Sequence, residues 1–450
     1  MRGMPLRLSG GTLMSRLRRV MTMLSAFLAL STMAIGLPAV QAQAAGSKLV
    51  IGVVAPFTGV DAALGPKYAV ACLAATQAIN QQGGIMGHQI SCKTVDTRGD
   101  PADAVPAVRQ MYATTSNLSL VIGCTSDEAS TVVPVFGAHK TVSFCMTGES
   151  EFDSVHFPYF YRLVPPDASD SAAMVKIAQR NGYKNIALAF GNDAGSQTFV
   201  APALSAIKAS GMKVVSNQTL DINATTFQTE AQNIVAAHPD VILMEALGAA
   251  GVALLTSIYQ LNGNKMIPVI GTSAMIDPTF FSGVTTSPIG VQNFINNFTA
   301  DNQTVNFGGP AYPLYKKLVL AQTGKVKGVP SFAGLLTANG TVHLYDGINL
   351  AAMAMVMAHS TSGAKYKADI LKIAEGVKGA VNVSTFAAAV KALKAHKKIH
   401  YVGVGGSYQF DSYQTAFGPF EADQFKADGT TVAVGGSLGY CNLTLCKPTL

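Results

Sequence analysis

The sequence carries little net charge once its N-terminal segment is set aside. Its 450 residues include 32 Lys and Arg against 25 Asp and Glu, a formal net charge of +7. The first 44 residues hold five Arg and no Lys or acid, so the remainder has 27 basic and 25 acidic residues, a difference of +2. No Lys/Arg-rich run with interleaved aromatic residues is present. These absences argue against nucleic acid or an anionic membrane surface as a partner.

Long apolar runs are also missing, except for one near the N-terminus. Residues 20–37 are apolar, follow the basic stretch RLRR and precede the small residues of QAQA. This layout predicts a signal peptide over residues 1–44, cleaved so that the mature chain begins near Ala45. The alternative is a transmembrane anchor, which needs roughly 18–20 apolar residues, but the small residues favour cleavage. Residues 30–46 contain no cysteine, so no lipid attachment site is expected.

Cysteine occurs only after the predicted cleavage point, and no C-x-x-C motif is present. In an oxidising compartment an even number of cysteines favours disulfides. The closest pair in the sequence is Cys441 and Cys446, which we expect to be bonded. The other four either pair or remain buried thiols: Cys72, Cys92, Cys124 and Cys145. No Cys/His cluster has zinc-ligand spacing, and His396 and His400 lie in a Lys-rich helix end that is expected to be solvated. We therefore expect neither a metal nor a cofactor.

The familiar catalytic motifs are absent as well. The loop PFTGVDAALGPK has Pro66 where a phosphate-binding loop needs Lys, and G-x-G-x-x-G does not follow the first predicted strand. Neither G-x-S-x-G nor H-E-x-x-H occurs. The neighbouring acids Asp127 and Glu128, like Glu149 and Glu151, are expected to be solvated or to mark helix starts rather than to act as an acid/base pair. The sequence thus predicts that the protein is not an enzyme.

Short apolar runs alternate with helical patterns along the chain, which is typical of parallel βαβ units. At the start of one helical pattern, Asp100 is a plausible N-cap, with Pro101 in the first turn. Strands are predicted at 48–55, 88–96, 118–123 and 141–146, and again at 185–190, 213–220, 240–246 and 266–271. Later helices near 310–323, 341–360, 364–377 and 383–396 are expected to cover the first set of strands.

This rhythm predicts an α/β fold of two doubly wound parallel-sheet lobes joined by a multi-strand hinge. Pro165-Pro166 marks the first crossing, residues 285–290 the return, and the segment near 400 the last. The N-terminal lobe would comprise 45–164 plus about 289–400. The C-terminal lobe would comprise 165–288 plus about 401–450.

Polar residues cluster where these predicted strands end, and ligands of open parallel sheets lie beyond the carboxyl ends of the strands. Hydroxyls and backbone N–H groups at helix starts bind a carboxylate without any catalytic group. A carboxylate across the cleft, such as Glu245, could take an ammonium group. The candidates at strand ends are Thr58, Thr125, Ser126, Met146, Thr147, Asp193, Glu245 and Ser273.

Several segments resemble one family. GVVAPFTG…ALG, AINQQGGIMGHQI, DTRGDPADAV, FYRLVPPD, TTFQTEAQNIVAAHPDVIL and YDGINLAA resemble, in this order, the periplasmic branched-chain amino acid-binding proteins, over about residues 48–435. The resemblance implies a type I periplasmic binding protein fold. It implies a monomer that hands an unaltered solute to an ABC-transporter permease.

The resemblance also implies roles for individual positions. Ser126 or Thr125 would supply a hydroxyl, Cys145 a carbonyl and Thr147 a second hydroxyl to the ligand. The loop with Phe57 and Thr58 would form a wall of the cleft. The second lobe departs from the family pattern, because Ala194 stands where a Tyr is frequent and Ser273 where an acid is frequent; Glu245 would substitute for that acid. An aromatic acid, another small carboxylate or an amide is therefore an alternative to a branched-chain amino acid.

Three other functions are alternatives to this role. The same fold could serve a membrane sensor, which the sequence does not distinguish from a transporter component. A secreted hydrolase would need a nucleophile with a base, and no such constellation is evident. A cytoplasmic repressor with a similar core would need an N-terminal DNA-binding helix pair, where the signal peptide is predicted instead.

Overall fold

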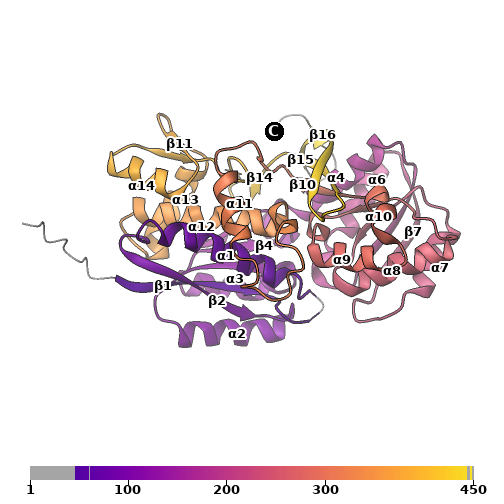
Figure 1. The fold of residues 1–450 in the computed structure, drawn as a ribbon, viewed down its shortest axis with the longest axis horizontal. Coiled ribbons are helices and arrows are strands. Elements are labelled where there is room, and N and C mark those ends of the chain that lie inside the picture. Colours follow the sequence, from indigo (N-terminus) through magenta and orange to yellow (C-terminus); the bar gives the residue numbers. More distant parts are fainter. Residues whose placement is uncertain (1–45, 60, 443–445, 448–450) are drawn as a thin grey trace, which may run out of the picture. The chain divides into compact units, whose positions relative to one another are not determined.

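A computed structural model describes residues 46–59, 61–442 and 446–447. The predicted signal peptide lies outside these residues. Within them, the chain forms two large sheets flanked by helices (Figure 1), and two further sheets of two strands each. We call the five-stranded sheet with its helices the first lobe, and the eight-stranded sheet with its helices the second lobe.

The sheet of the first lobe is parallel throughout and follows the order β2-β1-β3-β4-β5. Its central strands read as continuous apolar runs because helices cover both faces. The strands are β1 (Gly46–Ala55), β2 (His88–Asp96), β3 (Leu118–Thr125), β4 (Ser143–Met146) and β5 (Phe160–Arg162).

Two sets of helices, far apart in sequence, cover the first sheet. The early helices include α2, in which Asp100 accepts a hydrogen bond from the backbone N–H of Ala102 (2.7 Å) and Pro101 occupies the first turn, as the sequence predicts. Of the late helices, orange in Figure 1, α11, α12 and α14 lie against α1, and α13 packs against α12. These elements are α1 (Leu64–Asn80), α2 (Pro101–Thr114), α3 (Ser126–Ala138), α11 (Tyr312–Leu320), α12 (Asn339–Met357), α13 (Gly363–Ala374) and α14 (Phe386–Lys394).

Helix α12 is nearly all buried and forms the centre of the first lobe's core. Its one carboxylate, Asp346, is fully buried but accepts hydrogen bonds from Tyr401 Oη (2.7 Å), Tyr408 Oη (2.9 Å) and the backbone N–H groups of Val404 and Gly405. Burial raises the pKa of Asp346 to about 6. These bonds hold the chain after β12 (Ile399–Tyr401) on the first lobe.

The second sheet has the order β17-β16-β15-β10-β9-β8-β6-β7. Strands β6 to β10 are parallel, and β15 and β16 add to them antiparallel. The strands are β6 (Asn185–Gly191), β7 (Lys213–Leu220), β8 (Val241–Glu245), β9 (Val269–Gly271), β10 (Phe298–Gln303), β15 (Phe420–Phe425), β16 (Thr431–Cys441) and β17 (Cys446–Lys447). The helices are α4 (Asp167–Arg180), α5 (Ala194–Gln197), α6 (Val200–Ala209), α7 (Gln228–Ala236), α8 (Gly248–Leu261), α9 (Pro278–Thr286) and α10 (Gly290–Asn297).

The chain leaves the second lobe later than the sequence predicts. Residues 285–290 do not return to the first lobe; they are a turn between α9 and α10, and β10 then pairs with β9. The last crossing is also later, because Tyr401, Val404 and Tyr408 pack in the first lobe's core. The predicted boundaries at about 289 and 401 therefore differ from the sheets that the structure forms.

Three connections link the two lobes: β5 to α4, β10 to α11, and β14 (Ala416–Phe417) to β15. They are hydrogen-bonded to one another, from the N–H of Arg162 to the carbonyl of Gln414 (3.0 Å) and from the N–H of Thr304 to the carbonyl of Pro419 (3.0 Å). The first connection contains Pro165-Pro166, as predicted.

All six cysteines are disulfide-bonded. Cys72 in α1 is joined to Cys92 in β2, Cys124 in β3 to Cys145 in β4, and Cys441 to Cys446 across β16 and β17. Within the described part of the chain, no helix has the length and apolar character needed to cross a membrane.

Candidate functional site

A pocket lies between the two lobes, at the carboxyl ends of their parallel strands. Residues that follow β1, β3, β4, β6, β8 and β9 line it, together with the starts of α4 and α12. Its volume is about 100 Å³, which is room for roughly seven to ten water-sized groups. This is the position at which open parallel sheets bind ligands.

The structure places six of the residues predicted from sequence in this lining, from both lobes. They are Thr125, Ser126, Met146, Asp193, Glu245 and Ser273. Five other predicted residues lie outside the lining: Phe57, Thr58, Cys145, Thr147 and Ala194.

The first residues of the loop after β1, Phe57 and Thr58, are held away from the pocket by Asp96, at the end of β2. The Asp96 carboxylate accepts hydrogen bonds from the N–H of Phe57 (2.9 Å), the N–H of Thr58 (3.2 Å) and the Thr58 hydroxyl (2.6 Å). Phe57 lines a separate, wider groove, and the Thr58 side chain is exposed. The sequence pattern predicts correctly at which edge of the sheet this loop lies, but it does not predict in which direction the side chains of Phe57 and Thr58 point.

The other three residues support the pocket from behind or beside it. Cys145 is fully buried and bonded to Cys124. Thr147 is 1% exposed; its hydroxyl accepts a hydrogen bond from Ser126 Oγ (3.2 Å) and donates one to Glu149 (3.3 Å). Ala194 is exposed, and the next residue, Gly195, lines the pocket instead.

Sequence reasoning missed most of the pocket's carboxylates. Asp61, Asp127, Asp167 and Asp170 line it in addition to the two acids already predicted. The expectation of solvated acids at 127 and 128 is wrong, because Asp127 is 9% and Glu128 0% exposed. The expectation that they mark a helix start is right, since α3 begins at 126. The spacing Thr-x-x-Glu is a capping-box signature that could have identified the role of Glu128.

The N-terminus of α3 is occupied by the protein's own carboxylates. Glu128 accepts hydrogen bonds from the N–H of Thr125 (3.0 Å), from its hydroxyl (2.5 Å) and from the hydroxyl of Thr97 (3.2 Å). Asp127 accepts a hydrogen bond from the N–H of Gly195 in the second lobe (3.0 Å). The first turn of this helix is therefore already supplied with negative charge.

Acids of the second lobe are held by hydroxyl groups. Glu245 accepts hydrogen bonds from Thr272 Oγ1 and from Ser196 Oγ (3.5 Å). Asp167 accepts one from Thr198 Oγ1. These hydrogen bonds fix the carboxyl groups in position but bring no positive charge to them.

The pocket carries a surplus of acid. Six carboxyl groups line it, and Lys67 is the one basic residue among its described lining. Lys67 forms a buried ion pair of 3.2 Å with Asp277, at the start of α9. Desolvation, and after it the neighbouring Asp127, raise the pKa of Asp61 to about 9. Burial likewise raises the pKa of Asp167 to about 7 and that of Glu245 well above its ordinary range.

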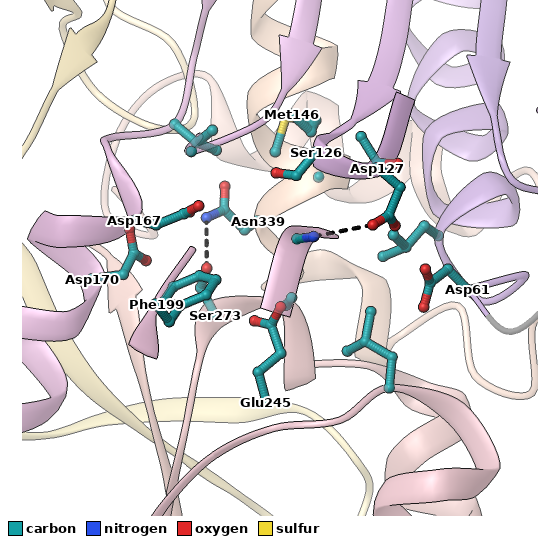
Figure 2. Close-up of a pocket in the computed structure, with 18 of the residues that line it drawn as sticks. Asp61, Ser126, Asp127, Met146, Asp167, Asp170, Phe199, Glu245, Ser273 and Asn339 are labelled. Atoms are coloured by element: carbon teal, nitrogen blue, oxygen red, sulfur yellow. Dashed lines mark hydrogen bonds between the residues drawn. The ribbon is translucent and has the colours of Figure 1, made fainter. Parts of the chain in front are cut away.

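Contacts across the pocket join the lobes. Besides the Lys67–Asp277 pair, Asn339 Nδ2 at the start of α12 donates a hydrogen bond to Ser273 Oγ (3.2 Å), and the N–H of Asp167 donates one to the carbonyl of Gly148 (2.9 Å). Figure 2 shows Asp61 and Asp127 on one side of the pocket and Asp167 and Asp170 on the other. Among the residues that the structure describes, no group of three or more His, Cys, Asp or Glu is arranged to hold a metal ion.

Two curated relatives of this chain carry the name Leu/Ile/Val-binding protein or homolog of it. The Leu/Ile/Val-binding protein BraC3 of Rhizobium johnstonii is 24% identical over 242 residues, which are 53% of this chain and 65% of the relative. A Leu/Ile/Val-binding protein homolog of Brucella melitensis is 35% identical over 82 residues, 18% of this chain and 22% of the relative. The chain thus matches less than two thirds of the length of either relative.

Solved structures show the same fold. LivJ, the branched-chain amino acid transporter substrate-binding protein of Streptococcus pneumoniae, in complex with isoleucine, has a TM-score of 0.66 at 17% identity and covers 87% of this chain and 98% of its own. A solute-binding protein of an ABC transporter from R. palustris, in complex with benzoate, has a TM-score of 0.65 at 16% identity, with 86% and 96% covered. The expected type I periplasmic binding protein fold is confirmed by these neighbours.

The family described as "Periplasmic binding protein" matches residues 48–306, more than half of the chain. This match shows that the chain belongs to the periplasmic binding protein family, and with the relatives above it confirms the resemblance found in the sequence.

Proposed function

We infer that the protein captures a small solute between its lobes and delivers it, unaltered, to the permease of an ABC transporter. One observation carries this proposal: the pocket is built jointly by both lobes, so that its walls are complete only when the lobes meet. A solute that contacts both walls favours the closed arrangement by its differential affinity for it.

The three connections between the lobes would act as the hinge. Contacts such as Lys67–Asp277 and Asn339–Ser273 bridge the lobes, so they would break when the lobes separate. The loaded protein would then present a surface that the empty protein lacks, which allows a permease to tell the two apart.

We place the protein outside the cytoplasm, where it acts as a monomer. Residues 1–44 would direct its export as a signal peptide that is then cleaved. No chemistry on the solute is proposed. The same closure could instead signal to a membrane sensor, and only the identity of the membrane partner separates these two roles.

In this role, the solute would contact six residues of the lining: Thr125, Ser126, Met146, Asp193, Glu245 and Ser273. Relatives of this fold hold isoleucine or benzoate. An amino acid, an aromatic acid or an amide is therefore the starting set of solutes for a search.

Native mass spectrometry of protein purified without refolding tests the proposal directly. We expect a bound small molecule that is released unchanged on denaturation, and a thermal midpoint that rises when it is added back. Affinity purification of the loaded protein from membranes should recover a transporter permease. Recovery of a chemically altered solute, or of a receptor kinase in place of a permease, would contradict the proposed role.

A further inference from the structure

The chemistry of the pocket lining indicates which class of solute it takes. Six carboxyl groups line the pocket, and its single basic residue, Lys67, is already paired with Asp277. A solute carboxylate placed here would face these acids with no free cation to balance it. A solute with positive charge would meet groups of opposite sign on several sides.

Several groups that could bind a carboxylate are already used by the protein. The N–H of Gly195 is bonded to Asp127, and the N–H and hydroxyl of Thr125 are bonded to Glu128. Helix N-termini favour anions because their first N–H groups lack partners inside the helix. At α3 that preference is met by the helix's own first-turn acids.

A second, independent feature also points to a hydrogen-bond donor as ligand. Asn339 is 7% exposed and lines the pocket, and its Oδ1 atom has no hydrogen-bond partner among the described residues. Its Nδ2 atom donates to Ser273, so the amide orientation leaves the oxygen free. A buried amide oxygen without a partner is costly, and an N–H group of the solute would satisfy it.

Acids are distributed over two sides of the pocket. Asp61 and Asp127 lie on one side and Asp167 and Asp170 on the other, with Glu245 below them (Figure 2). The two sets belong to different parts of the fold, the first lobe and the start of α4. A single ammonium group could satisfy one set and would leave the other unbalanced.

We propose that the pocket binds a short aliphatic diamine, with one ammonium group among Asp61, Asp127 and Glu245 and the other beside Asp167 and Asp170. This inference rests on the proposed role as a solute-binding protein and names its solute class. A cavity of about 100 Å³ matches a chain of a few methylene groups between two amines. The alkyl part would contact the apolar lining, which includes Met146 above the pocket and Phe199 beside Asp170 (Figure 2).

Calorimetry of the purified protein with butane-1,4-diamine, n-butylamine, 4-aminobutanoate and leucine tests the proposal. We expect the diamine to bind at least about tenfold more tightly than the monoamine, since charge-assisted hydrogen bonds at the second end are each worth that much. The two carboxylate-bearing compounds should bind more weakly than either amine. CaCl₂ should give no saturable heat.

Two variants locate the ends. Asp61→Asn and Asp167→Asn should each weaken diamine binding about ten- to a hundredfold. In Asp167→Asn the preference for the diamine over n-butylamine should shrink, because one of the two carboxyl groups at that end has been removed while the other end is intact. Asp103→Asn is the matched control, since Asp103 is exposed and lies on α2, away from the pocket.

The outcomes separate this inference from the proposed function. If leucine or benzoate binds tightly while the diamine gives no heat, the diamine assignment is overturned and the solute-binding role stands. Equal diamine affinities for the wild type and both pocket variants would also overturn it. If native mass spectrometry finds no solute and none of the amines or acids binds, both the assignment and the proposed function fail.

Discussion

Replacing Asp61 by asparagine should stabilise the empty protein at neutral pH. Asp61 is 6% exposed, and its carboxyl group faces Asp127, Asp193 and Glu245, which belong to other elements. Tyr68, in the following helix α1, also lies near it. Desolvation and, after it, these acids raise its pKa from 3.8 to about 9. Asparagine has nearly the same shape and carries no proton that depends on pH.

The sign of the effect follows from proton linkage. The folded protein holds the Asp61 proton more tightly than the unfolded chain does, so stability is complete below about pH 3.8, declines as the pH rises, and levels off above about pH 9. At pH 7 the difference from 3.8 is 3.2 pH units, and each unit corresponds to ~1.4 kcal/mol. The wild type therefore loses up to about 4 kcal/mol by pH 7 that Asp61→Asn retains.

Urea unfolding at pH 5, 6, 7 and 8 measures this effect in the wild type, in Asp61→Asn and in the exposed control Asp103→Asn. We expect the free energy of unfolding of Asp61→Asn to exceed that of the wild type by an amount that grows with pH, with an unchanged m-value. The control should run parallel to the wild type. A constant difference across this range, or a less stable Asp61→Asn at pH 8, would refute the argument that an unbalanced buried carboxyl destabilises the empty pocket.

Three further predictions concern the contacts that hold the lobes and sheets. Lys67→Met leaves the Asp277 carboxylate buried without its partner and should open the lobes, which solution scattering would show as a larger radius of gyration. Lys67→Met combined with Asp277→Asn should recover part of the compact form. If the double variant recovers none of it, the pairing is contradicted. Replacing Cys72 and Cys92 by serine opens a loop of 20 residues and should lower the free energy of unfolding by about 3 kcal/mol in urea titrations; an unchanged midpoint would count against it. Gly148→Ala places a methyl group on the carboxylate at the start of α4, so solute affinity by calorimetry should fall at least about tenfold, and undiminished affinity would show that this contact is not needed for closure.

Much of the fold could be predicted from local sequence pattern. The alternation of apolar runs and helical segments predicted eight of the parallel strands but missed β5 and β10. Asp100-Pro101 marked the start of α2 because capping depends on neighbours in sequence. Pro165-Pro166 marked the first connection for a similar reason, since proline stops both helix and strand. Residues 285–290 failed as a crossing because a turn containing proline, here at 287–289, ends a helix equally well within one lobe.

The candidate site was less accessible to sequence. Strand ends pointed to the correct edge of each sheet, and six residues chosen that way line the pocket. Burial of Asp127 depends on the second lobe, through the N–H of Gly195 about 70 residues later, and no local pattern records that approach. The same holds for Asn339, which reaches the pocket from a helix far along the chain.

The three disulfides have a consequence for how the chain reaches its destination. Each closes a loop of modest length within one lobe. Cys72–Cys92 and Cys124–Cys145 join different helices and strands, so they form once those elements have come together. If the chain is exported as we propose, it leaves a reducing compartment in which these cysteines remain reduced and unbonded. A chain without disulfides is easier to keep unfolded while it passes through a channel. Oxidation after export would then stabilise the folded protein and prevent it from passing back.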